Sequence, residues 1–158
     1  MISIHIGDIT HFEVDAIVNA SNGQGFMGGL LGRLFHFHGV AESLHFATKG
    51  VVEKEARAIC QVQKIEPGSV FVTSAYSLQA RYVFHAVTMR KPGQKSTMET
   101  VKICLQNIVK EAQEFQVSSV AVPLLGTGTG RLDKQQVHEL TCSELEKSPG
   151  INWIIVSK

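Results

Sequence analysis

The sequence is poor in the features that mark secreted and membrane proteins. It has only three cysteines, at positions 60, 104 and 142, and no Cys-x-x-Cys pair. Scattered cysteines in odd number argue against a disulfide framework and favour a reducing compartment, so we expect a cytoplasmic location. The first residues carry no secretory signal, and no apolar run reaches the length of a membrane span. We therefore expect no membrane partner.

A strong charge of either sign is also missing. The formal net charge is +1 at pH 7, from 15 Lys and Arg against 14 Asp and Glu, and no run of basic residues occurs. This balance argues against nucleic acid as a partner and leaves RNA binding the weakest of the functions considered. The length of 158 residues and the 44% hydrophobic content are typical of one globular domain covering residues 1–158.

What the sequence does contain is a buried strand that leads into a glycine-rich turn. The apolar run at 120–125 predicts a strand covered on both faces, and the stretch GTGTG follows it at 126–130. A helical pattern starts near Asp133. Glycines let backbone N–H groups approach a phosphate, and a helix N-terminus favours its charge. No lysine follows the glycines as a nucleotide-hydrolysing P-loop requires, so we predict a phosphate cradle made of backbone.

A second unit of strand, glycine loop and helix lies near the N-terminus. A short strand over 16–20 ends in Ser21 and Asn22, and the glycine-rich stretch 23–29 follows. The helical pattern after it has one apolar stripe, made of Leu30, Leu31, Leu34 and Phe35. The glycines at 23–28 match GxGxxG, but the acidic residue that should close the next strand of a dinucleotide-binding unit is missing. Two glycine loops instead predict a site for two neighbouring phosphates.

The remaining segments alternate between strand and helix patterns. We expect strands over 1–6, 70–72, 82–87 and 152–156, and helices over 40–59 and 133–147, the first interrupted near Gly50. Ser96 and Glu99 have capping-box spacing and open a further helix. Its apolar face consists of Val101, Cys104, Leu105, Ile108, Val109, Ala112 and Phe115. The alternation predicts an α/β domain with helices on both faces of a mostly parallel sheet.

Four segments in this order resemble the signature of the macrodomain family. They are GDIT at 7–10, VDAIVNASN at 14–22, the glycine pair at 28–29 and PLLGTGTG at 123–130. The resemblance covers essentially the whole chain. It implies a three-layer α/β/α sandwich around a mixed, mostly parallel six-stranded sheet. It also implies that the partner is ADP-ribose, free or attached to protein, with no separate cofactor.

The resemblance assigns roles to individual residues. It implies that Asp8 accepts a hydrogen bond from the adenine amine, that Ile9 offers its backbone, and that Asn22 contacts the distal ribose. Asn22 is also the catalytic candidate, and Asn19 is expected to support the loops. The other expected ligand-binding residues are Gly28, Gly29, Leu30, Leu31, Gly126, Thr127, Gly128, Thr129 and Gly130. The residue types alone leave alternatives open, with Asp8 as a turn cap and Asn22 as a turn former.

Departures from the family pattern bear on activity. Aligning the first loop places Leu31 where hydrolytic members carry an acidic residue, and Leu31 has no acceptor for a proton. Loss of a general base commonly removes about 10²–10⁴ in rate. Met27 replaces a glycine, Gly130 replaces an aromatic residue, and no aromatic residue follows the last strand, which leaves Phe12 as a candidate to cover the adenine. We therefore predict a module that binds ADP-ribose, related NAD metabolites or ADP-ribosylated protein, with a weak hydrolase of ADP-ribose adducts as the alternative.

Other polar residues carry weaker hypotheses. His36 or His38 could act as a base near the distal ribose, although a core or surface role is the commoner one for such residues. Two histidines at i and i+2 point to different faces of a helix, so we expect no metal site. The charged stretch at 53–57 has the pattern of a solvated helix face and is expected to have no function.

Overall fold

A six-stranded sheet forms the middle layer of the protein, whose computed structural model describes residues 1–34 and 39–157. The strands lie in the order β1-β6-β5-β2-β4-β3, and every neighbouring pair is parallel except β3 with β4. Their bounds are β1 Ile2–Ile6, β2 Ala16–Asn22, β3 Val70–Ser74, β4 Tyr82–Met89, β5 Ser119–Pro123 and β6 Asn152–Ser157. The expected mixed, mostly parallel sheet of six strands is confirmed.

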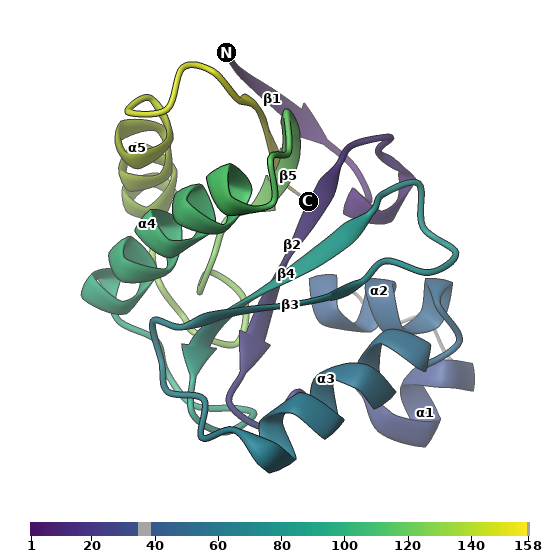
Figure 1. Cartoon of the computed structure of the whole chain (residues 1–158). Coiled ribbons are helices and arrows are strands. Elements are labelled where there is room, and N and C mark those ends of the chain that lie inside the picture. The colour runs from purple at the N-terminus through teal and green to yellow at the C-terminus, as the bar shows by residue number, and fades with distance from the viewer. Residues whose placement is uncertain (35–38, 158) are drawn as a thin grey trace.

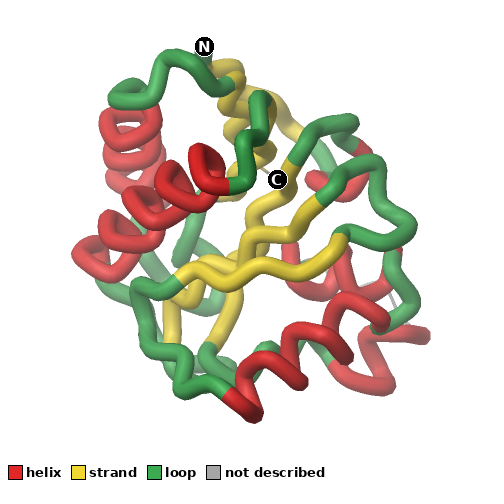
Figure 2. The backbone as a smooth tube through the Cα atoms, in the orientation of Figure 1, coloured by secondary structure: helices red, strands yellow, loops and turns green. Residues whose placement is uncertain are grey.

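Helices cover both faces of this sheet (Figure 1). One face packs against α4 (Met98–Glu114) and α5 (Lys134–Leu145), and the other against α2 (Val40–Ala47) and α3 (Val51–Val62). The short helix α1 (Gly29–Leu34) lies beside α2, and a 3-10 turn, η1 (Ile9–His11), follows β1. Figure 2 shows the strands between the two groups of helices, which is the predicted three-layer sandwich. Among the described residues, no helix is long and apolar enough to cross a membrane.

The apolar face predicted for α4 is the centre of the larger core. Five of its residues are fully buried against the sheet together with Phe84, Trp153 and the α5 residues Val137 and Leu145. These five are Val101, Cys104, Leu105, Ile108 and Ala112, while Val109 and Phe115 pack at the edge. Burying one large apolar side chain contributes about 1.5–3 kcal/mol, so this stripe fixes α4 firmly on the sheet.

Two helix boundaries bear on the loops. Gly50 has φ 82° between α2 and α3, a left-handed conformation that interrupts the helix where the sequence predicted. The cap predicted for α4 was one residue early, because Thr97 and not Ser96 accepts the hydrogen bond, from the N–H of Thr100 at 3.1 Å. Ser96 points inward instead. Its hydroxyl donates to the Thr88 carbonyl at 2.9 Å and its N–H donates to the Gly130 carbonyl at 3.1 Å, which ties β4 to the glycine-rich loop.

A polar chain crosses the sheet interior next to β2. Asn19 donates from its amide to Nδ1 of His85 at 3.1 Å, and Nε2 of His85 donates to the hydroxyl of Thr73 at 2.9 Å. Asn19 therefore supports β4, whereas the sequence had suggested that it supports the loops. Phe71 stacks on the imidazole at 4.6 Å between ring centroids. Complete burial lowers the pKa of His85 from 6.5 to about 3, so the ring is neutral in the folded protein.

The neutral His85 predicts a specific dependence of stability on pH. Unfolding releases the ring to protonate near pH 6.5, so its contribution is full above that pH and is lost as the pH falls toward about 3. Below pH 6.5 this one group should lower the free energy of unfolding by up to about 1.4 kcal/mol per pH unit. Urea unfolding of wild type and His85→Gln between about pH 7.5 and 5 should give a shallower slope for the variant. Equal slopes would contradict the assignment.

Candidate functional site

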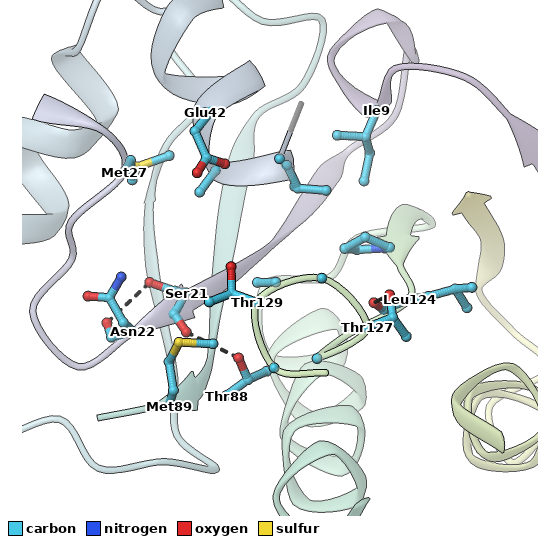
Figure 3. Close-up of a pocket in the computed structure, with 18 of the residues that line it drawn as sticks. Ile9, Ser21, Asn22, Met27, Glu42, Thr88, Met89, Leu124, Thr127 and Thr129 are labelled. Carbon is cyan, nitrogen blue, oxygen red and sulfur yellow. Dashed lines mark hydrogen bonds between the residues drawn. The ribbon is translucent and has the colours of Figure 1, made fainter. Parts of the chain in front are cut away.

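A cavity of about 530 Å³ opens at the edge of the sheet where the parallel strands end (Figure 3). Its floor contains the residues at or just after the carboxyl ends of five strands: Gly7, Asn22, Met89, Pro123 and Ser157. Open α/β sheets bind their ligands in such a crevice, because the following loops and helix N-termini converge there. The volume lies within the range of about 300–1,000 Å³ that is usual for small-molecule sites.

The loop after β5 lines one side of the cavity, and all five of its predicted residues, 126–130, take part. The Thr127 hydroxyl donates to the Leu124 carbonyl at 2.8 Å, and the N–H of Leu132 donates to the Gly126 carbonyl at 3.0 Å. Within the described part of the chain, the N–H groups of Gly128, Thr129 and Gly130 donate to no protein acceptor. These unpaired donors can bind an anion through the backbone alone.

Two glycines of this loop are required for different reasons. A Cβ on Gly130 would lie 2.5 Å from the Gly126 carbonyl oxygen, so no side chain fits there without opening the loop. The aromatic residue that the family pattern suggested at position 130 is therefore excluded by the tight turn. A Cβ on Gly128 would meet nothing within 4 Å. Position 128 thus faces open space beside the cavity, and a side chain could be added there without collision.

Asn22 shapes the loop at the other side of the cavity. Its amide nitrogen donates to the Phe26 carbonyl at 2.8 Å, while its amide oxygen accepts from the N–H groups of Gln24 at 3.1 Å and Phe26 at 3.3 Å. Asn22 is therefore a turn former, and it also lines the cavity at the end of β2. One proton of the amide group is left over from these bonds, and this is the group that could contact a ligand.

A buried carboxylate holds the predicted phosphate loop from behind. Glu53 of α3 is only 5% exposed, and its Oε2 accepts from the N–H groups of Met27 at 2.8 Å and Gly29 at 3.0 Å. His45 of α2 lies 3.3 Å from the same oxygen through Nδ1, and its Nε2–H donates to the Gly29 carbonyl at 2.7 Å. The prediction that residues 53–57 form a solvated face was wrong for Glu53, since tertiary packing turns this carboxylate onto the loop.

The helix that borders the cavity is α2 and not α1. Gly28 lines the cavity, but Leu30 and Leu31 are 72% and 63% exposed, and neither they nor Gly29 are among the lining residues. The predicted place of Leu31 in the site is therefore not what the structure shows. The first turn of α2 stands there instead, with the lining residues Gly39, Val40, Ala41 and Glu42. The first N–H groups of a helix have no partners within the helix, so this end also attracts anions.

Asp8 and Ile9 lie at the opposite end of the cavity. Ile9 is buried and lines it, whereas Asp8 sits beside the lining residues Gly7 and Ile9. Oδ1 of Asp8 accepts from the N–H of Thr10 at 2.9 Å and from its hydroxyl at 2.7 Å, which caps η1. The turn-cap role of Asp8 is thus present in the structure. Its contact with adenine stays a prediction, and Phe12 packs against His5 and is not a lining residue.

Sequence reasoning missed several cavity residues. They are the α2 turn, the segment after β4 with Pro92 and Gly93, and Lys134 at the start of α5. The glycine at 39, directly before a helical pattern, was the available signal for the α2 turn, since glycine is a common N-cap. The candidate bases His36 and His38, and Phe35 of the expected stripe, lie outside the described residues.

Sequence comparison with known proteins gives a family match and several relatives. A family model described as Macro domain matches residues 18–141. ADP-ribose glycohydrolase MACROD1 of Mus musculus is 31% identical over 148 residues, which are 92% of this chain and 42% of that protein. Two uncharacterised relatives, from Aeropyrum pernix and Sulfurisphaera tokodaii, are 31% and 36% identical, and the chain spans 66% and 65% of their lengths. The chain thus spans less than two thirds of these curated relatives.

Solved structures of macrodomains share the fold of this chain. The macrodomain of Thermus aquaticus DarG superposes with a TM-score of 0.85 at 28% identity, covering 100% of this chain and 99% of that one. A Trypanosoma brucei macrodomain in complex with ADP-ribose has a TM-score of 0.76 at 22% identity, with 99% and 64% covered. The second likeness, at this level of identity, is one of fold.

The hydrogen bonds from the Met27 and Gly29 N–H groups to Glu53 predict a large effect on stability from a residue outside the cavity. Glu53→Ala leaves the buried N–H groups of Met27 and Gly29 without their acceptor, so the free energy of unfolding should fall by about 3 kcal/mol. Lys54→Ala, an exposed change on the same helix, should alter it by less than about 0.5 kcal/mol. Denaturant unfolding measures both. Similar small effects for the two variants would show that Glu53 does not hold the first loop.

Proposed function

The chain belongs to the Macro domain family, and on that premise we propose that its cavity binds ADP-ribose, either free or attached to a protein. The observation that carries this proposal is the set of backbone donors at 128–130 that have no acceptor among the described residues, in a loop lining a cavity that the first turn of α2 also lines. A diphosphate has acceptor oxygens on two neighbouring phosphorus atoms. Donors from two sides of one cavity are therefore matched to it.

The two ends of the cavity differ in a way that suits the two ends of this ligand. The adenosine end is proposed to lie by Asp8 and Ile9, where a buried apolar side chain adjoins a carboxylate. The distal ribose is proposed to lie by Asn22, whose remaining amide proton can reach a hydroxyl. Gly130 adds no aromatic side chain over the ligand, which is compatible with a ribose attached to a larger molecule.

Hydrolysis of ADP-ribose adducts is the second candidate. It is favoured by the 31% identity to a protein named as an ADP-ribose glycohydrolase, although that protein is more than twice as long. Both candidates use the same cavity and differ in whether a bound adduct is cleaved. All three cysteines are free thiols, which supports the reducing, cytoplasmic location expected from the sequence.

Gly128→Glu is the direct test of binding. The new side chain enters open space, so the fold should be retained, but its carboxylate stands beside the proposed diphosphate. Titration calorimetry with ADP-ribose should show binding to wild type and a loss of at least about 100-fold in the variant, equivalent to about 2.8 kcal/mol.

Gly150→Glu is the matched control. Position 150 also has nothing within 4 Å of an added Cβ, and it precedes β6 away from the cavity. This variant should bind ADP-ribose as wild type does. Absence of binding to folded wild type at millimolar ligand would refute the proposal, and an equal loss in both variants would place the binding outside the loop at 126–130.

A further inference from the structure

The strand β1 is one edge of the sheet and carries none of the residues that usually protect an edge. Among the described residues its one neighbouring strand is β6, and Figure 1 shows it at the margin of the sheet beside the N-terminus. An edge strand presents backbone N–H and C=O groups that another strand can bind, and proteins usually block it with charged residues, proline or a bulge. The sequence of β1, ISIHI, has no lysine, arginine, carboxylate or proline, and its register with β6 is unbroken.

The opposite edge of the sheet, β3, is protected by side chains of two helices. The N–H of Ser74 donates to a carboxylate oxygen of Glu55 on α3 at 3.3 Å. The amide of Asn107 on α4 donates to the Gly68 carbonyl, just before β3, at 2.8 Å. Both helices contact this strand. The two edges are therefore built differently, and β1 is the one open to another strand.

The hydrogen bonds between β1 and β6 show which backbone groups are available. The Met1 carbonyl accepts from the N–H of Trp153 at 2.9 Å, and the N–H of Gly7 donates to the Ser157 carbonyl at 3.0 Å. Successive residues of a strand direct their N–H and C=O groups to opposite sides, so the odd-numbered residues of β1 face β6. The residues whose N–H and C=O groups point to the open edge are Ile2, Ile4 and Ile6.

The side chains of these three residues form an apolar row. Ile2 packs against the larger core, on the face that α4 and α5 cover, and alternation places Ile4 and Ile6 on the same face. Ile4 is 57% exposed and Ile6 is 85% exposed. Antiparallel pairing of two copies centred on Ile4 puts Ile4 opposite Ile4, Ile2 opposite Ile6, and Ser3 opposite His5 on the other face. The strand is therefore complementary to itself in its backbone and in its side chains.

We propose that β1 pairs antiparallel with β1 of a second copy of this chain, which joins two six-stranded sheets into one continuous sheet. The contact is two-fold symmetric, so each isoleucine at the edge exchanges both backbone hydrogen bonds with the isoleucine opposite. No like charges of Lys, Arg, Asp or Glu meet along the strand, and the net charge of +1 adds little repulsion.

This dimer leaves both cavities accessible. The carboxyl end of β1 leads to Gly7 at the cavity, so antiparallel pairing directs the two cavities to opposite ends of the joined sheet. The contact involves one short strand from each molecule and is smaller than about 1,200 Å², which is typical of weak association. We expect a dissociation constant on the order of 0.1 mM.

Sedimentation equilibrium between about 50 µM and 1 mM tests the dimer, because its population depends on concentration. Ile4→Pro removes only an N–H that points to the open edge, so pairing with β6 is kept while pairing with the second copy is lost. Ile4→Lys, at an exposed position, places two like charges opposite each other. Both variants should dimerise at least about tenfold more weakly than wild type. Val62→Lys adds the same charge at a residue of α3 that is 87% exposed, and should dimerise as wild type does.

Amide hydrogen exchange followed by NMR locates the contact. The N–H groups of Ile4 and Ile6 should exchange about threefold more slowly at 1 mM than at about 50 µM wild type, in proportion to the remaining monomer. The N–H groups of Ser3 and His5 face β6 and should not change. Far-UV circular dichroism of each variant checks that the fold is kept.

Wild type that stays a monomer at about 1 mM would overturn the proposal and leave this edge to a strand of another protein. A dimer that both Ile4 variants retain, or that Val62→Lys weakens equally, would overturn it by placing the contact elsewhere. Assembly beyond the dimer would also contradict it, because a two-fold contact closes. None of these results depends on ADP-ribose, so the proposed function is judged separately by calorimetry.

Discussion

The backbone N–H groups in the loop after β5 that have no acceptor among the described residues are the feature on which the rest of this site depends. Peptide donors are normally paired within the protein or with water, so a loop that presents three of them at a cavity keeps its shape through other bonds. Ser96 supplies one such bond by donating to the Gly130 carbonyl, and the Thr127 hydroxyl supplies another. Opposite, Glu53 and Asn22 hold the first loop in the same way. The donors are kept free because these bonds satisfy the groups around them.

This arrangement explains why several polar groups are buried where apolar ones would pack more simply. Glu53 is removed from water and compensated by two backbone N–H groups that donate to it, with the His45 ring packed against the same oxygen. Burial of a carboxylate is costly unless such partners are present. His85 and Asn19 play a similar part inside the sheet, where they join β2 to β4 just before both strands reach the cavity. These buried polar groups make the fold less stable than apolar packing would, but they fix the geometry at the strand ends.

Much of this could be predicted from the sequence, because local patterns decide it. The strands, the apolar face of α4 and the loop at 126–130 follow from periodicity and glycine placement. The site was predicted less well where a residue acts across the fold. Glu53 reads as one charge in a charged helix until α3 packs under the first loop. Leu31 was assigned to the site by aligning the first loop with the family pattern. In the structure Leu31 is exposed on α1, and the described residues after Gly28 line the cavity again from Gly39.

Anion recognition and reactivity depend on different parts of the chain. Anion recognition rests on main-chain donors and on the end of a helix, and these are insensitive to most side-chain changes as long as the loops keep their shape. The departures from the family pattern at Met27 and Gly130 leave the shape of the loops intact, since Met27 is buried in the core and Gly130 preserves the tight turn. Reactivity depends instead on individual side chains placed against the ligand. A cavity of this kind can therefore retain its ligand while its chemistry changes.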